Sequence, residues 1–133
     1  DPVGKLDPYR RVEAETIAWS EGLKTEKSEA GMYVTAIHDG DYIRVRNVDF
    51  KKGAKSFEAV AASSSSGGQI EIRLDDKEGM LIGTCVIGNT GGPESWKTFQ
   101  AQVDKVKGVH DVYFIFRGGE DELFNFDCWK FIR

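Results

Sequence analysis

Long hydrophobic runs are missing from this 133-residue chain, and so is any surplus of basic residues. No apolar stretch approaches the roughly 20 residues that a membrane-spanning helix needs, so we expect no membrane partner. Lysine and arginine total 18 against 22 aspartates and glutamates. The net charge of -4 argues against a nucleic-acid partner, because a phosphate backbone attracts basic surfaces. This length suits one domain, which we expect to be a monomer.

Cysteine and histidine are scarce. The two cysteines, Cys85 and Cys128, form no C-x-x-C pair, and the two histidines, His38 and His110, are far apart in the sequence. Such spacing does not fit a structural zinc site. We expect two small, buried, apolar cysteine side chains, and one disulfide between them stays open as an alternative.

Glycines recur along the chain, and apolar and polar residues alternate in the short segments between them. This alternation is typical of half-buried strands, and no stretch of about eleven or more residues keeps a helical period. About eight or nine short strands predict an all-β fold, either a sandwich or a barrel. The alternating apolar positions are Ile43, Val45, Val48, Phe57, Ala59, Ala61, Ile70, Ile72, Leu74, Val112, Phe114 and Phe116.

The ends of the chain and one low-complexity segment define its organisation. Residues 1–9 hold two of the three prolines, and we interpret them as an N-terminal arm or the remnant of a linker. Residues 10–133 then form a single module. No signal peptide is recognisable, which we interpret as a module cut from a longer secreted enzyme. Residues 63–68 (SSSSGG) are of turn length, so we expect a mobile hairpin loop there.

Sequence motifs for catalysis are lacking as well. The chain has no G-x-S-x-G motif, and neither histidine has an obvious acid–base partner. The adjacent acids at 75–76 and 120–122 are typical of solvated turns. We therefore expect no enzyme activity and no catalytic residue. A small glycoside hydrolase that uses a pair of carboxylates stays open as an alternative.

Three acidic residues in the first and last predicted strands can converge. Glu13 and Glu15 are two apart in an early strand, so they share one face. Asp127 lies in the last strand, and first and last strands often pair in antiparallel sandwiches. Calcium binds six to eight oxygen atoms, so the three carboxylates are candidate ligands. By spacing alone, solvent-facing acids are the simpler interpretation of the two glutamates.

The aromatic residues divide into a core set and a candidate site. Tyr33 and Trp96 lie at loop ends, where large flat rings can pack on the apolar face of a sugar. Asn125 lies near another loop boundary, and its amide can bind sugar hydroxyls. Capping of the core by either ring is an equal alternative. The aromatics expected in the core are Phe57, Phe99, Phe114, Phe116, Phe126, Trp129 and Phe131.

Taken in order, these residues resemble the family 6 carbohydrate-binding modules attached to bacterial plant-cell-wall hydrolases, especially xylanases and arabinofuranosidases. The resemblance runs from Arg11 to Ile132. It is carried by VEAET (Val12–Thr16), GMYVTAIHDGDYIRV (Gly31–Val45), GGQIEIRLD (Gly67–Asp75), MLIGTCVIGNTGG (Met80–Gly92), SWKT (Ser95–Thr98), GVHDVYFIF (Gly108–Phe116) and LFNFDCWKF (Leu123–Phe131).

The resemblance implies a lectin-like β-sandwich of the jelly-roll type with a structural calcium ion. Glu13, Glu15 and Asp127 match the family's calcium ligands, and a backbone carbonyl from the loop before the first site aromatic usually completes the set. Tyr33 and Trp96 match the two rings that sandwich one sugar. Asn125 matches the asparagine that hydrogen-bonds its hydroxyls.

The implied function is that of a non-catalytic, extracellular module that binds xylan or xylo-oligosaccharides, or other β-linked glycans. It would hold a tethered glycoside hydrolase catalytic domain on its polymer. One departure bears on ligand preference, because related modules often have an aromatic residue where this chain has Pro93 and Glu94. No residue is assigned to the second cleft that some members carry. A calcium-dependent structural or adhesion domain without a sugar ligand remains an alternative.

Overall fold

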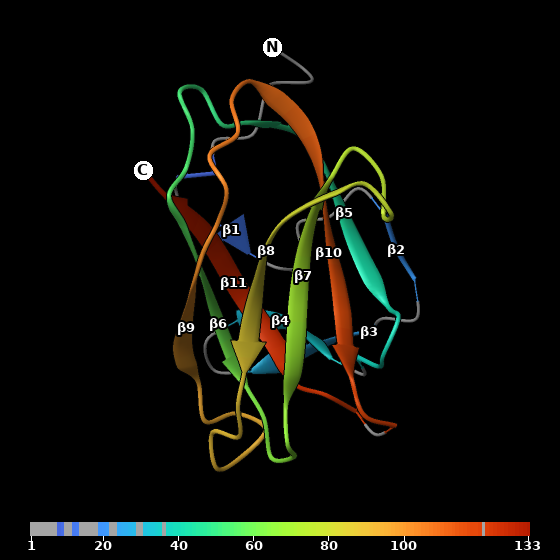
Figure 1. The fold of residues 1–133 in the computed structure, drawn as a ribbon. Coiled ribbons are helices and arrows are strands. Elements are labelled where there is room, and N and C mark those ends of the chain that lie inside the picture. Colours follow the sequence, from blue (N-terminus) through green and yellow to red (C-terminus); the bar gives the residue numbers. More distant parts are fainter. Residues whose placement is uncertain are drawn as a thin grey trace.

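Figure 1 shows the fold in a computed structural model of the chain. The structure describes residues 8–9, 12–13, 19–21, 24–28, 31–35, 37–120 and 122–133, with backbone only for 12–13, 19–21, 24–28 and 31–33. These residues form eleven strands in two antiparallel sheets, and none of them is helical. No described helix is therefore able to cross a membrane.

The six-stranded sheet has the order β3-β4-β11-β6-β9, and β1 also pairs with β11. Its strands are β1 (Val12–Glu13), β3 (Lys24–Ser28), β4 (Gly31–Thr35), β6 (Ser56–Ala62), β9 (Lys97–Gln102) and β11 (Asn125–Ile132). The five-stranded sheet has the order β2-β5-β10-β7-β8. Its strands are β2 (Trp19–Glu21), β5 (Tyr42–Asp49), β7 (Gly68–Leu74), β8 (Met80–Ile87) and β10 (Val109–Gly118).

This arrangement confirms the predicted all-β sandwich of the jelly-roll type. The eleven described strands exceed the eight or nine that the sequence predicted. Two of the additional strands, β1 and β2, are only two and three residues long. Segments this short contain too few residues to show a period of two, so their pairing is visible only in three dimensions.

The core lies between the two sheets and follows the predicted alternation. Every one of the twelve alternating apolar positions is at most 4% exposed. The aromatic contacts join the sheets: Trp129 of β11 and Phe114 of β10 meet edge to face, with ring centroids 5.0 Å apart. Full burial of each such side chain contributes about 1.5–3 kcal/mol, so this cluster accounts for much of the cohesion between the sheets.

One predicted core aromatic is less buried than expected. Phe99 is half-buried and packs against the margin of the core. It lies in β9, which is at one edge of the six-stranded sheet and alternates between exposed and half-buried residues. An edge strand has a neighbour on one side only, so its inward-facing side chains are covered less completely. The other six predicted core aromatics are buried.

Both cysteines are buried thiols, as the sequence predicted, and they are not joined by a disulfide. Cys85 belongs to β8 and Cys128 to β11, which are in different sheets. Burial raises the pKa of Cys85 to about 11, because the apolar surroundings disfavour the thiolate. The disulfide alternative is therefore wrong.

The segment at residues 63–68 is not a hairpin, so that expectation was wrong. It leaves β6 in one sheet and enters β7 in the other. Side-chain and backbone hydrogen bonds hold its first residue: Ser63 Oγ donates to the Leu123 carbonyl at 2.8 Å, and the Ser63 amide donates to Thr90 Oγ1 at 2.9 Å. Ser63 is 2% exposed, so a low-complexity sequence here forms a buried anchor between loops.

Candidate functional site

Three loops that cross from one sheet to the other gather at one end of the sandwich, at the bottom of Figure 1. They connect β6 to β7, β8 to β9, and β10 to β11. Loops on a rigid β scaffold are common locations for binding residues, because their polar groups are not used up in sheet ladders. We refer to this region as the pocket end.

A pocket of about 340 Å³ opens between these loops. Its described lining is mostly polar and comes from four separate segments. The lining residues are Thr35, Ala62, Ser63, Ser64, Ser65, Pro93, Glu122, Leu123, Phe124 and Asn125. Hydroxyl, amide and carboxylate groups converging on a concave surface can bind a ligand that carries several hydroxyl groups.

Asn125 is the best-defined polar group of this pocket. It is the first residue of β11 and is half-buried. Its Oδ1 accepts a hydrogen bond from Thr35 Oγ1 at 2.7 Å, and its Nδ2 donates to the Pro93 carbonyl at 2.7 Å. An amide nitrogen carries two N–H donors, and Pro93 takes only one of them. The side chain is therefore held in one orientation while it retains donor capacity at the pocket wall.

Trp96 ends the β8–β9 loop, immediately before β9, and is half-buried. Three residues earlier in the same loop, the Pro93 carbonyl accepts the hydrogen bond from Asn125. The loop is also held at Thr90, whose amide donates to the Ser63 carbonyl at 2.8 Å. The structure thus brings the Trp96 loop and Asn125 together, although Trp96 is not among the described residues that line the pocket.

Tyr33 is described by its backbone alone, so its ring lies outside the described part of the structure. It belongs to β4, where its Cα is paired with Glu26 of β3. The next residue, Val34, is paired with Phe126 of β11, and Thr35 contacts Asn125. The backbone of Tyr33 is therefore close to the start of β11, and the position of its ring stays a prediction.

Sequence reasoning missed Thr35, Ser63 and Thr90, which shape this pocket. Their hydroxyl groups bond Asn125, the Leu123 carbonyl and the Ser63 carbonyl, respectively. The only signal in the sequence is that each follows or ends an apolar strand. Small hydroxyl residues in such positions are too common to be singled out without knowledge of which loops meet.

Asp127, the predicted calcium ligand of the last strand, lies at a β-bulge. The register between β6 and β11 shifts between Phe126 and Cys128, so that Asp127 and Cys128 together oppose Val60. Both residues line a pocket of about 270 Å³, together with Glu58 and Val60 of β6. Asp127 is 5% exposed, so the bulge buries a carboxylate beside this pocket.

The other two predicted calcium ligands are described less completely. β1 pairs with β11, as expected for first and last strands, and Glu13 is opposite Cys128. The backbones of Glu13 and Asp127 are therefore on neighbouring strands, one register position apart. Glu15 lies outside the described residues. Among the described residues, no group of three His, Cys, Asp or Glu side chains converges, and the calcium prediction remains open.

His110 is far from the pocket end and has structural partners. Its Nδ1 lies 3.0 Å from Asp75 Oδ2 and its Nε2 lies 2.8 Å from the Lys107 carbonyl. Burial of the ring lowers its pKa, but the two hydrogen bonds and the charge of Asp75 outweigh burial and raise the pKa above its ordinary value. Two acceptors on one ring favour the imidazolium form, which suits a link between the β7–β8 and β9–β10 connections.

Comparison with known proteins agrees with this geometry. The profile of carbohydrate binding module (family 6) matches residues 13–133. The arabinoxylan arabinofuranohydrolase of Bacillus subtilis (strain 168) is 47% identical over 139 residues, which cover 98% of this chain but only 27% of that relative. The chain therefore spans about a quarter of the length of this relative.

Two solved structures have nearly the same fold. A family 6 carbohydrate-binding module from Clostridium cellulolyticum, in complex with xylose, superposes with a TM-score of 0.94 and 40% identity, covering 96% of this chain and all of that one. A β-1,3-glucan-binding module of the same family from Bacillus halodurans gives a TM-score of 0.94 and 33% identity, covering 98% of this chain and all of that one. The two share a fold but differ in the sugar that their descriptions name.

Proposed function

Because this chain belongs to the family 6 carbohydrate-binding modules, we propose that it is a non-catalytic module that binds xylan and xylo-oligosaccharides at the pocket end. The observation that carries the proposal is the position of Asn125. Its amide is fixed between Thr35 and Pro93, at the wall of a pocket lined by hydroxyl groups. An oriented amide discriminates among sugar hydroxyls because unpaired polar groups in the complex cost free energy.

In this proposal Trp96 and Tyr33 supply the apolar surfaces and Asn125 supplies the hydrogen bonds. The C–H face of a sugar ring packs on an aromatic ring, and exclusion of water from this contact provides most of the affinity. Pro93 and Glu94 occupy the position where we expected an aromatic residue in related modules. Pro93 lines the pocket there, and most of the other lining side chains carry hydroxyl, amide or carboxylate groups, which favours a ligand with exposed hydroxyl groups over a more apolar one.

The proposal is tested by comparing Trp96→Ala with Tyr113→Ala, an aromatic change on the other sheet. Affinity electrophoresis in gels containing soluble arabinoxylan should show about tenfold or greater weakening for Trp96→Ala, because a stacking residue is lost. Tyr113→Ala should migrate like the wild type. Circular dichroism verifies that both variants are folded. Equal retardation of Trp96→Ala and wild type would refute the site.

Glycan preference is addressed by titration calorimetry with xylo-, cello- and laminari-oligosaccharides. We expect the xylo-oligosaccharides to bind most tightly, by analogy with the xylose complex and the arabinoxylan-acting relative. Tighter binding of laminari-oligosaccharides would transfer the ligand assignment to β-1,3-glucans. Release of reducing sugar from xylan by the isolated chain would contradict the non-catalytic part of the proposal.

We also propose that Glu13, Glu15 and Asp127 hold a structural calcium ion. Carboxylate oxygens are the donors that calcium prefers, and the buried Asp127 at a bulge beside β1 fits this role. Bound calcium would link β1 to β11 and so stabilise the folded state. We expect EDTA to lower the melting temperature of the wild type, and Asp127→Asn to remove most of that shift. The exposed Asp104→Asn is the control and should retain the shift.

The remaining part of the proposal concerns the full-length protein. A module of this kind raises the local concentration of an attached glycoside hydrolase on its polymer, outside the cell where such polymers occur. Fusion to a xylanase catalytic domain should accelerate hydrolysis of insoluble xylan but not of soluble xylo-oligosaccharides. Trp96→Ala in the fusion should abolish the difference.

A further inference from the structure

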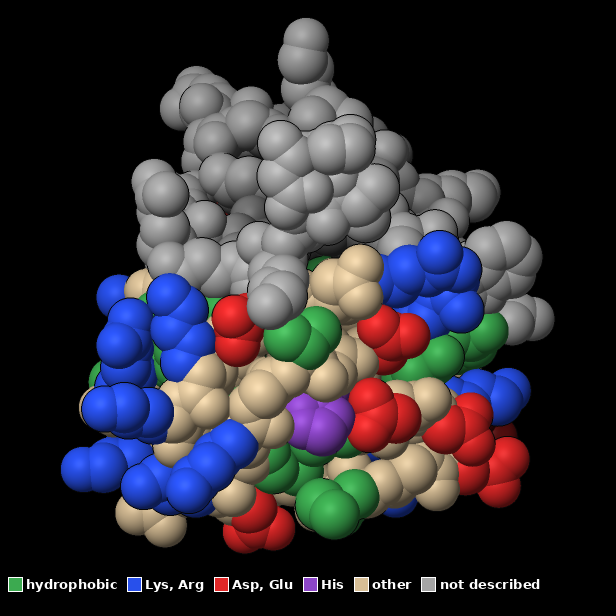
Figure 2. All heavy atoms as spheres, turned by 90° about the horizontal axis from the view of Figure 1, so that it is seen from above, with side chains coloured by type: hydrophobic (Ala, Val, Ile, Leu, Met, Phe, Trp, Pro, Cys, Tyr) green, Lys and Arg blue, Asp and Glu red, His purple; other side chains and the backbone are tan. Residues whose placement is uncertain are grey.

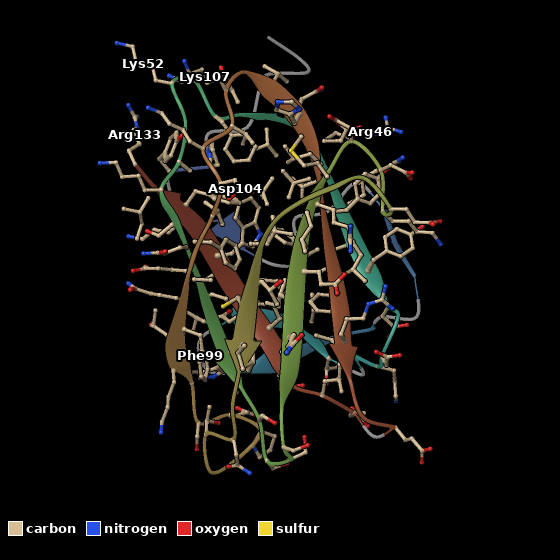
Figure 3. The ribbon with its side chains drawn as sticks, in the orientation of Figure 1. Arg46, Lys52, Phe99, Asp104, Lys107 and Arg133 are labelled. Carbon is tan, nitrogen blue, oxygen red and sulfur yellow. The ribbon has the colours of Figure 1, made fainter. Side chains whose placement is uncertain are left out.

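Six basic side chains gather at the end of the sandwich opposite the pocket end. They come from the turn after β5, the loop before β10 and the C-terminus, and all are exposed. We refer to Lys51, Lys52, Lys55, Lys105, Lys107 and Arg133 as the basic end. Figure 2, which looks down on this end, shows Lys and Arg side chains concentrated on one side of it. Figure 3 shows Lys52, Lys107 and Arg133 projecting outward there.

Few of the described acidic residues accompany these cations. None of the six takes part in an ion pair within the part of the chain that the structure describes. The acids that accompany them in the same turns are Asp49, which accepts the Lys51 amide at 2.9 Å, and the exposed Asp104. Within these turns, six described cations accompany two described acids, and Asp75 lies nearby against His110. A positive surplus of the described side chains therefore remains here on a chain whose net charge is -4.

The backbone beneath this charge is firmly connected. The Phe50 amide donates to the Gly108 carbonyl at 2.8 Å, and the Gly108 amide donates to the Lys51 carbonyl at 3.1 Å. The Lys55 amide donates to the Ile132 carbonyl at 2.7 Å. Three segments that are distant in sequence thus form one platform. A fixed arrangement of like charges gives a steady positive potential, which favours a partner with repeated negative charges.

Two of the basic side chains are also supported by packing. A Cβ atom at Gly53 would lie 2.5 Å from Lys105 Cγ, so the absence of a side chain there makes room for the lysine stem. The Arg133 guanidinium lies 4.4 Å from the centre of the Tyr9 ring. The first contact restrains the Lys105 stem, and the second restrains the Arg133 guanidinium itself, which lowers the ordering cost of binding.

We propose that the basic end is a second binding surface, for polysaccharides that carry carboxylate groups. Five of the six cations are lysines, which act as point charges and suit separate carboxylates along a flexible polymer. The Tyr9 ring beside them is covered by Arg133, which leaves this ring less available for stacking of nucleic-acid bases. The choice of a polysaccharide rests on the proposed function, whereas the basic end itself does not.

The two surfaces would then have different ligands and different physical signatures. The pocket end binds a neutral sugar chain mainly by apolar packing and hydrogen bonds, which salt affects little. The basic end binds by attraction between exposed charges, which added salt screens at a distance of about 8–10 Å at physiological ionic strength. A module with both surfaces would contact a neutral and an acidic polymer in the same cell wall.

The test is affinity electrophoresis of the complete chain in gels with polygalacturonate, with its methyl ester as the uncharged match, and with arabinoxylan. We expect retardation by polygalacturonate at low salt, none by the ester, and loss of retardation at 0.3 M NaCl, about twice physiological ionic strength. The double variant Lys52→Gln/Lys107→Gln should bind polygalacturonate about threefold or more weakly, because two exposed charges are removed.

The matched control is Arg46→Gln/Lys77→Gln, which lowers the net charge equally. Figure 3 shows Arg46 on the opposite side of the molecule from Lys52 and Arg133, and Lys77 lies over the Tyr42 ring of β5. It should retain polygalacturonate binding. An equal loss in both variants, or none in the first, would overturn the proposal. Equally tight binding of double-stranded DNA and polygalacturonate would also overturn the proposal, since the surface would then bind anions in general. Loss of polygalacturonate binding in Trp96→Ala would assign that ligand to the pocket end instead.

The two proposals fail separately. Arabinoxylan retardation that persists in Lys52→Gln/Lys107→Gln and vanishes in Trp96→Ala supports the pocket end whatever happens with polygalacturonate. A chain that binds neither polymer overturns both.

Discussion

The two ends of the sandwich use the same kind of connection, a loop that crosses between the sheets, but hold it in different ways. At the pocket end, side chains make the decisive bonds, as in Ser63 to Leu123 and Asn125 to Pro93. At the basic end, most of the bonds between segments join backbone amides and carbonyls, as in Phe50 to Gly108 and Lys55 to Ile132. Side-chain bonding fixes the polar groups themselves, whereas backbone bonding fixes the platform and leaves long side chains to reach outward.

The charges of the two ends also differ. Exposed acids such as Glu94, Glu120 and Glu122 belong to the loops of the pocket end, and the basic end has the local positive surplus. The net charge of -4 conceals this separation. A weakly acidic chain can therefore present two electrostatically distinct surfaces, because the fold places its loops at opposite ends.

The largest expected effect on the free energy of unfolding comes from alanine substitutions at two glycines, which differ in the atoms that surround them. Gly67, at the pocket end, has φ of +80°, and a Cβ there would clash with the Ile87 carbonyl oxygen. Gly67→Ala should destabilise the protein by about 3 kcal/mol, because backbone atoms cannot move aside. Gly53→Ala, at the basic end, should cost about 1–2 kcal/mol, because the nearest neighbour is the flexible Lys105 stem.

Urea unfolding monitored by circular dichroism measures both free energies. Gly91→Ala, with φ of +98° and nothing within 4 Å of a new Cβ, isolates the backbone strain alone and should cost about 1 kcal/mol. A Gly53 variant that is less stable than the Gly67 variant would reverse the comparison between the two ends.

A smaller effect is expected from the hydroxyl group of Ser63. Its Oγ donates to the Leu123 carbonyl and accepts from the Ser65 amide in a buried position. Ser63→Ala leaves the Ser65 amide without this acceptor and the Leu123 carbonyl with only the Ser65 hydroxyl, at 3.1 Å, so it should cost about 1–2 kcal/mol. The exposed Ser64→Ala in the same loop is the control and should be within about 0.5 kcal/mol of the wild type in thermal unfolding. Equal stability of the two variants would contradict the anchoring role.

The smallest expected effect is on the pH dependence of stability, through His110, which is far from the pocket end. His110 has a raised pKa in the folded state, so its protonation stabilises the fold below the ordinary value of 6.5, and this contribution is lost as pH rises through the folded-state pKa. Because the ring is partly exposed, the loss should be below about 1 kcal/mol. The melting temperature of wild type should therefore fall between about pH 6 and 8 relative to His110→Gln. Parallel pH profiles of the two proteins would show that the Asp75 link contributes nothing.

The fold could be predicted largely from local patterns. The alternation of Ile70 and Ile72 with Glu71 and Arg73 is visible in the sequence, and the buried faces follow it. Alternation is a property of each strand alone, so it can be recognised in the sequence without knowing the order of the strands in the sheet. Phe99 departed from the pattern because β9 is an edge strand, and the position of a strand in its sheet is not a local property.

The residue types of the candidate site could be predicted from the sequence, but the contacts that hold these residues in place could not. Asn125, Trp96 and Tyr33 were singled out as residues at loop ends, and the structure connects the first two through Pro93. The role of Ser63 was missed, since its partners Thr90 and Leu123 are 27 and 60 residues away. The bulge at Asp127 was missed too, because a register shift exists only between paired strands.

Local sequence patterns were enough to indicate an all-β fold with a buried aromatic core, since burial of alternating apolar residues is dictated strand by strand, and the family resemblance favoured a sandwich over a barrel. The sequence also singled out Tyr33, Trp96 and Asn125 as candidates for a carbohydrate-binding site. Only the tertiary structure decided which loops meet, which carboxylate a bulge buries, and that five lysines and the C-terminal arginine share one end. The physical reason is that these features depend on contacts between segments distant in the chain, which the pairing order of the two sheets creates.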